Sequence, residues 1–268
     1  MEDATPASEY EHFTHFEAVP YGVARQNGQD MTLYCSLHLP KDADIPPPLF
    51  VWFHGGAFKF GEHGHKMSRR LGRRLTRMGI AVASVQYRLR GTAEDLSEPV
   101  LSRIEEYQSH RGKLIRAGLC EYRSFVALED GVRFLSWASG AADRFGWSGK
   151  RVLGGSSAGG LTAYNIAFGA ERLGLGVPDI QGVFACSGGF NYPDLVTPRD
   201  GFRSLALHNP NDRRVSIAGV RMLKHKLGDR LELLESEDHI HGHCELFPGE
   251  TKSNTYGRIA TFIHETTA

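Results

Sequence analysis

A glycine-rich turn at 154–160 constrains the fold of this chain more than any other segment. It reads Gly-Gly-Ser-Ser-Ala-Gly-Gly, follows a short apolar stretch at 151–153 and precedes a helix-forming stretch at 161–168. The pentapeptide GxSxG, centred on Ser157, is typical of a serine nucleophile on a sharp strand-to-helix turn. Such a turn needs residues without side chains around the serine, which Gly155 and Gly159 supply. The sequence therefore predicts that Ser157 is a nucleophile beside a helix N-terminus, which favours negative charge.

A phosphate-binding loop is the alternative for a glycine-rich turn. The chain lacks GxxxxGK[ST], and the glycine spacing does not fit GxGxxG with an acidic residue downstream. The nucleophile is therefore the favoured interpretation.

Short apolar strands alternate with amphipathic helices along nearly the whole chain. The run Leu49–Phe53 is continuously apolar, as expected for a strand buried on both faces of a sheet, and 80–87 reads as the next strand. Between them, apolar residues recur at helical spacing over 67–78, so strand, helix and strand form a parallel crossover unit. Further strands are expected at 30–40 (near a sheet edge), 181–186, 204–207 and 231–235, and helices at 125–138 and 255–264. The alternation predicts a single α/β domain over 1–268 with a mostly parallel central sheet flanked by helices.

Small residues also follow the apolar strand 49–53. A hydroxyl that attacks a carbonyl creates an oxyanion, which needs N–H donors already in place. We expect the amides of Gly56 and Ala57 in this loop and of Ala158 in the nucleophile turn to supply them. Gly55 would mainly permit the turn.

A serine nucleophile needs a histidine in reach and a carboxylate that orients the histidine. In this type of fold the acid follows the serine in the chain and the histidine comes last. Asp212 follows the strand 204–207, whereas Asp194, Asp200 and Asp229 do not follow a strand in this way. The sequence predicts Asp212 as the orienting acid.

Three histidines follow the last strand, at 239, 241 and 243. His239 lies closest to the strand, so we expect it to be the base, with His243 after Gly242 as the second choice. The run His-x-His-x-His-Cys, which ends at Cys244, also permits a metal site. No separate set of ligands supports that alternative, so no metal is expected.

Several motifs together resemble the esterases and lipases related to hormone-sensitive lipase. His54-Gly55-Gly56 resembles the HGG(G) motif of that group, Tyr87-Arg88-Leu89 its DYRL strand end, and 155–160 its GDSAGG turn; 127–130 is similar to its helix before the nucleophile strand. The likeness runs from about 49 to 239. It implies an α/β-hydrolase fold and cleavage of small carboxylic esters through an acyl-enzyme, with a Ser-His-Asp triad and no cofactor. Amide, thioester or lactone hydrolysis would use the same residues, and a catalytically silent binding protein is a further alternative.

The chain departs from that group at three places. Ala57 replaces the third glycine of the first motif, and Ser156 stands where the group usually has Asp. The polar stretch 91–123 is also longer than the group requires. Long loops in compact domains tend to be functional, so 96–119 is expected to form either a cap over the cleft or a surface elaboration.

Composition excludes several other classes of partner. Lys plus Arg and Asp plus Glu both total 31, so the net charge is formally zero and indicates neither a nucleic acid nor a membrane partner. The four cysteines are scattered and the N-terminal segment is polar and acidic, which favours reduced thiols, no signal peptide and a cytoplasmic location. A homodimer is compatible with the sequence.

Overall fold

Continuous apolar runs form the centre of one mixed sheet in the computed structural model, which describes residues 6–41, 43–112 and 116–268. The strand order in this part of the chain is β1-β2-β3-β5-β4-β6-β7-β8-β9. From β5 to β9 neighbouring strands are parallel, whereas β1, β2 and β3 pair antiparallel at one edge. The strands are β1 (Ser8–Glu9), β2 (Phe13–Gln26), β3 (Gln29–Pro40), β4 (Leu49–Phe53), β5 (Ala81–Val85), β6 (Arg151–Ser156), β7 (Gly182–Cys186), β8 (Arg203–His208) and β9 (Leu231–Glu235).

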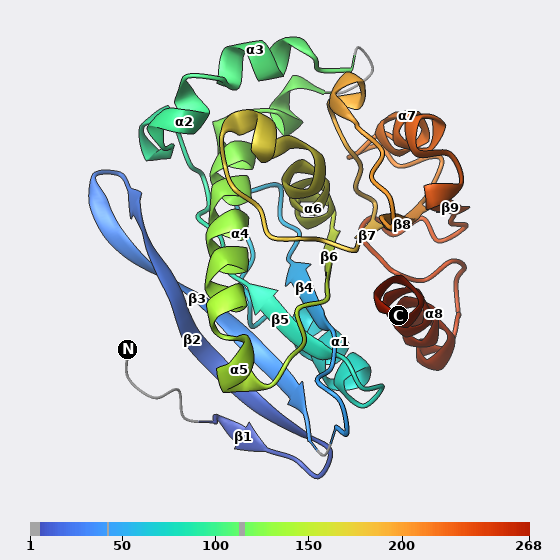
Figure 1. Ribbon diagram of the computed structural model, residues 1–268. Coiled ribbons are helices and arrows are strands. Elements are labelled where there is room, and N and C mark those ends of the chain that lie inside the picture. The colour runs from blue at the N-terminus through green and yellow to red at the C-terminus, as the bar shows by residue number, and fades with distance from the viewer. Residues whose placement is uncertain (1–5, 42, 113–115) are drawn as a thin grey trace.

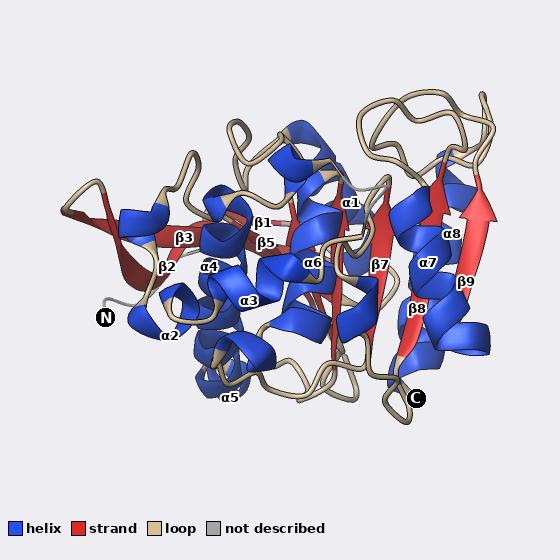
Figure 2. Ribbon diagram, turned by 90° about the horizontal axis from the view of Figure 1, so that it is seen from above, coloured by secondary structure: helices blue, strands red, loops and turns tan. Residues whose placement is uncertain are grey.

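Helices cover both faces of this sheet (Figures 1 and 2). The α-helices are α1 (Lys66–Thr76), α2 (Glu98–Leu101), α3 (Ile104–Ser109), α4 (Tyr122–Gly140), α5 (Ala142–Phe145), α6 (Ala158–Gly169), α7 (Ala218–Leu227) and α8 (Lys252–Thr267). Short 3-10 helices are η1 (Ala93–Asp95), η2 (Ala117–Leu119), η3 (Glu171–Leu173), η4 (Pro193–Leu195) and η5 (Gly228–Arg230). No helix in the described ranges is long and apolar enough to cross a membrane.

The alternation of side chains along β4 divides the core into two layers. Phe50 and Trp52 pack with residues of α1 and α8 on one face, and Val51 and Phe53 pack with residues of α4, α6 and α7 on the other. All five residues of β4 are buried, which explains why this strand is apolar without interruption. The predicted mostly parallel sheet flanked by helices is confirmed.

The long strand β2 was not predicted from the sequence. It pairs with β3 over most of its length, and its register shifts between Phe16 and Val19 and again between Pro20 and Gly22. Bulges interrupt the period-two alternation, and proline cannot donate a ladder hydrogen bond. The pattern that reveals β3 is therefore lost in its partner.

The polar stretch 91–123 leaves the sheet and contains η1, α2, α3 and η2; its residues 113–115 lie outside the described ranges. The ring of Tyr107 in α3 is tilted against that of Tyr192, with ring centroids 4.4 Å apart, and the Tyr107 hydroxyl lies against Gly169 at the end of α6. Figure 1 shows α2 and α3 beyond one end of α4. At about 1.5 Å per residue, Gly169 is roughly 18 Å along α6 from its start at Ser157. The cap therefore stays a prediction, and the contacts of α3 lie at the distal end of the nucleophile helix.

Arg88 and Asp130 join two segments that the sequence keeps far apart. The Arg88 backbone N–H donates to Asp130 Oδ2 at 2.7 Å, and its Nε donates to Oδ1 at 3.0 Å. Arg88 Nη1 also donates to the carbonyl oxygens of Arg25 and Asp95, at 2.6 and 2.7 Å. Arg88 is 1% exposed and Asp130 0%, so each charge depends on the other for its solvation.

Replacing Arg88 by Met should destabilise the fold strongly, because among the described residues it leaves the buried Asp130 carboxylate with only Arg133 and the backbone N–H of residue 88 as partners. We expect the free energy of unfolding to fall by about 3–5 kcal/mol in urea titrations. Arg133→Met is the matched control, since the Arg133 side chain is 36% exposed and its loss should cost less than about 1 kcal/mol. Equal losses for the two variants would contradict the assignment of Arg88 as the main partner.

His38 should make the fold sensitive to acid. Burial, with the nearby positive groups, lowers the pKa of His38 to about 3 from an ordinary 6.5. The contribution of neutral His38 to the free energy of unfolding is therefore fully present above pH 6.5. It is lost as pH falls towards 3, because His38 takes up a proton in the unfolded chain at a higher pH than in the folded chain. In this window His38→Gln should flatten the pH dependence of the free energy of unfolding by about 1.4 kcal/mol per pH unit. Parallel pH curves for the variant and the wild type would refute this.

Candidate active site

The nucleophile turn is formed by Ser157 between β6 and α6. Ser157 has φ 54° and ψ −119°, a backbone conformation that side chains disfavour and that often marks functional sites. Its N–H donates to the carbonyl of Cys186 at 2.8 Å, which ties the turn to the end of β7. A Cβ on Gly155 would lie 2.2 Å from the backbone of Gly159, so the turn closes only with glycine there.

The same turn packs directly against the loop after β4. A Cβ on Gly159 would lie 2.0 Å from the carbonyl oxygen of Phe53, and one on Gly55 would lie 3.5 Å from Ser157 Cβ. The loop has positive φ at Gly56 (127°), Ala57 (55°) and Phe58 (60°), which turns its peptide planes sharply. Among the described residues, the amides of Gly56, Ala57 and Ala158 have no hydrogen-bond acceptor. These are the three amides expected to bind an oxyanion.

His54 and Tyr87 support this loop from below. Their rings stack with centroids 4.3 Å apart, and the Tyr87 hydroxyl donates to the His54 carbonyl at 2.7 Å. Burial lowers the pKa of His54 to about 4, so the ring is neutral at neutral pH. The two segments that resemble the HGG and DYRL motifs thus contact each other through His54 and Tyr87.

His241 bridges the serine and an aspartate. Its Nε2 lies 2.7 Å from Ser157 Oγ and its Nδ1 lies 2.6 Å from Asp212 Oδ2. The His241 side chain is 15% exposed and that of Asp212 3%, and Ser157 is half-buried. Asp212 lies just after β8, as predicted.

The environment of Asp212 keeps it ionised. Burial alone would raise the pKa of its carboxyl, but the hydrogen bonds from His241 and from the backbone N–H groups of Arg214 and Val215 outweigh burial. The pKa is therefore lowered below its ordinary value. A carboxylate at this position can fix the imidazole tautomer and stabilise an imidazolium.

The structure does not place His239, the predicted base, against Ser157; His241 takes that position. His239 is exposed, and its Nδ1 lies 3.2 Å from the Asn209 side chain. Asn209 Nδ2 also donates to the carbonyls of Ser236 and Asp238. These bonds keep residues 236–239 next to the end of β9. The loop reaches the serine only two residues later. Gly242, with φ 83°, turns the chain directly after His241, but it adjoins His243 as well and so does not distinguish the two in the sequence.

Two serine hydroxyls hold the backbone of Gly242, the residue that follows His241. The Gly242 N–H donates to Ser187 Oγ at 3.0 Å, and Ser156 Oγ donates to the Gly242 carbonyl at 3.1 Å. A Cβ on Gly242 would lie 2.7 Å from Ser156 Oγ, so this approach requires glycine. Ser156, where the resembling group usually has Asp, thus contacts the His241 loop.

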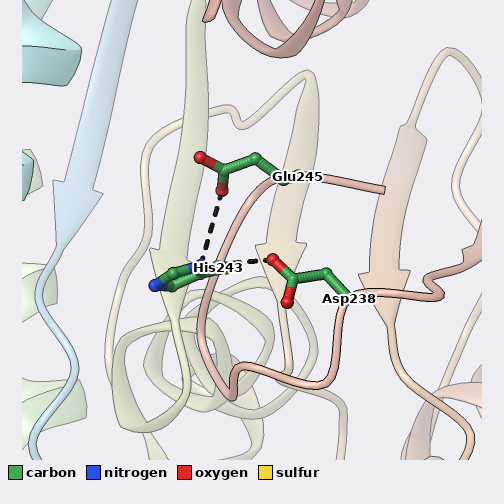
Figure 3. A group of neighbouring side chains, drawn as sticks. All are labelled: Asp238, His243 and Glu245. Carbon is green, nitrogen blue, oxygen red and sulfur yellow. Dashed lines mark hydrogen bonds and ion pairs between the residues drawn. The ribbon is translucent and has the colours of Figure 1, made fainter. Parts of the chain in front are cut away.

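His243, the second choice for the base, points into a separate acidic group (Figure 3). Its Nδ1 lies 3.2 Å from Asp238 Oδ2 and 3.8 Å from Glu245 Oε2. One ligand atom from each residue lies within 4.8 Å of the others, so the three could hold a metal ion. Lys252 forms an ion pair with Glu245, which supplies positive charge to the group. Cys244, named in the predicted metal alternative, is not part of it.

Comparisons with known proteins bear on the fold of the chain. No family model matches the chain. Gut esterase 1 of Caenorhabditis elegans is 34% identical over 93 residues, which are 33% of this chain and only 16% of that relative. Among solved structures, a truncated carbohydrate esterase from gut microbiota superposes with TM-score 0.66 at 12% identity, covering 98% of this chain and 99% of the other. Carboxyl esterase 2 of Tuber melanosporum superposes with TM-score 0.65 at 16% identity, covering 98% and 89%.

These structural neighbours superpose on nearly the whole chain. At such low identity, the likeness concerns the fold. The chain therefore has the α/β-hydrolase fold found in these esterases.

Proposed function

We propose that the protein is a serine hydrolase that cleaves small carboxylic esters through an acyl-enzyme. The proposal rests on the position of His241. Its Nε2 lies 2.7 Å from Ser157 Oγ, and its Nδ1 lies 2.6 Å from Asp212 Oδ2. The motif resemblance to the group related to hormone-sensitive lipase and the esterases with the same fold support it.

In the first half-reaction, His241 Nε2 takes the proton of Ser157 as the hydroxyl oxygen attacks the ester carbonyl. Asp212 accepts the Nδ1–H and stabilises the imidazolium that forms. The imidazolium then gives its proton to the leaving alcohol. In the second half, His241 activates a water that attacks the acyl-enzyme and releases the acid.

We assign the binding of the developing oxyanion to the backbone N–H groups of Gly56, Ala57 and Ala158. Preorganised donors of this kind contribute roughly 3–4 kcal/mol each to the transition state. The packing of Gly55 and Gly159 around Ser157 supports this, because it leaves little room for the loop to move.

The side chains of the two phenylalanines in this loop differ in their environment. Phe58 is fully buried, whereas Phe60 is 61% exposed and lies under the Arg90 guanidinium, 5.4 Å from it. Phe60 is therefore the one available to contact the acyl or alcohol part of a substrate.

Replacing Ser157 or His241 by Ala should lower kcat/KM for p-nitrophenyl acetate and longer esters by at least about 1,000-fold, because each change removes a group that acts in the transition state. His239→Ala and His243→Ala are the matched controls and should retain most of the activity. Retained activity in Ser157→Ala would refute the proposal, and a larger loss in His239→Ala than in His241→Ala would overturn the choice of base.

Ser187→Ala should lower kcat by about 10- to 100-fold with little change in KM, because the Gly242 amide loses its acceptor and His241 shifts from the serine. Ser136→Ala, which removes a hydroxyl bonded within α4, is the control with unchanged kcat. A fall in the melting temperature with unchanged kcat would mean that Ser187 has only a structural role.

A further inference from the structure

Two cysteines far apart in the chain meet beside the candidate active site. Cys186 and Cys244 are 58 residues apart, yet their Sγ atoms lie 2.7 Å from each other. Both side chains are buried, at 0% and 3% exposure. A small movement would bring these atoms to the disulfide bond length of about 2.05 Å.

The two cysteines connect the strand bonded to Ser157 with the loop that carries His241. Cys186 ends β7, and its carbonyl accepts the N–H of Ser157. Cys244 lies three residues after His241, on the loop whose Gly242 is held by Ser156 and Ser187. A covalent bond here would fasten the loop that carries the base to the strand that holds the nucleophile.

A small oxidant can reach one sulfur from outside. Cys244 lines a cavity of 260 Å³ between α1, the His241 loop and α8. The basic side chains around this cavity are His65, Lys66, Arg70, His243 and Lys252. Glu245 also lines it. The thiolate is the form of a cysteine that reacts with peroxides. Burial and the contact with Cys244 raise the pKa of the Cys186 thiol well above its ordinary value, so Cys186 stays protonated.

We propose that Cys186 and Cys244 are a modification site, at which a peroxide forms a reversible disulfide that fastens the His241 loop. The Cys244 thiolate attacks the peroxide, the O–O bond breaks, and Cys244 becomes a sulfenic acid as hydroxide (or alkoxide) leaves. The Cys186 sulfur then displaces the sulfenic oxygen, and this oxygen leaves as water with the proton of Cys186. Two thiols are oxidised and one peroxide is reduced, and a dithiol reductant reverses the change.

The disulfide closes a long loop and should stabilise the folded state. We expect the oxidised protein to melt higher than the reduced protein by at least about 5 °C. The four thiols that react after denaturation in the reduced protein should fall to two.

The experiment treats the reduced full-length chain with increasing hydrogen peroxide, then counts thiols in denaturant and maps peptides by mass spectrometry. A peptide pair linking Cys186 and Cys244, lighter by two hydrogen atoms and split by dithiothreitol, is the expected result. Cys244→Ala should lose both the linked pair and the rise in melting temperature. Cys120→Ser is the matched control and should keep both.

Four reactive thiols after treatment, or oxidation of Cys244 to a sulfinic acid without a linked peptide, would overturn the proposal. If Cys244→Ala does not fold, the peptide map of the wild type decides alone. None of these readouts uses ester hydrolysis, so this proposal and the proposed function can fail separately.

Discussion

The close contact between the nucleophile turn and the end of β4 is the constraint on which the site depends. Gly159 lies so near the Phe53 carbonyl that a methyl group there would approach it to 2.0 Å. This contact sets Ser157, the start of α6 and the loop after β4 in one arrangement. The amides of Gly56, Ala57 and Ala158 belong to this turn and this loop.

The base reaches this site by a different kind of support. Its loop leaves β9 at the far edge of the sheet and has no ladder hydrogen bonds of its own in the described residues. Asn209 holds its start, and Ser156 and Ser187 hold Gly242. Within the loop, the backbone N–H groups of Glu237 and Asp238 donate to the Leu246 carbonyl. Backbone packing thus fixes the nucleophile, whereas a few hydroxyl and amide groups fix the histidine.

This difference explains what could be predicted from the sequence. The strands β3 to β9, the mostly parallel sheet and the positions of Ser157 and Asp212 after strands follow from apolar runs and from glycines next to strand ends, which are local signals. His241 could not be chosen over His239, because the choice depends on Asn209, which lies 30 residues earlier and holds the strand exit. The meeting of Cys186 with Cys244 is also invisible locally, since it results from that same loop crossing β7. Likewise, the bulges in β2 hide the strand that pairs with β3.

Segments held by few side-chain contacts open at a lower free-energy cost than sheet strands do. The His241 loop contains no strand in the part of the chain that the structure describes, and Asp238, Cys244 and Glu245 lie on it. A change in the contacts of this loop therefore alters how often the loop opens. An additional bond there would reduce its opening without altering the nucleophile turn, because that turn is already fixed by the backbone of β4 and β7. The mobility of the His241 loop can thus change while the conformation of the Ser157 turn stays the same.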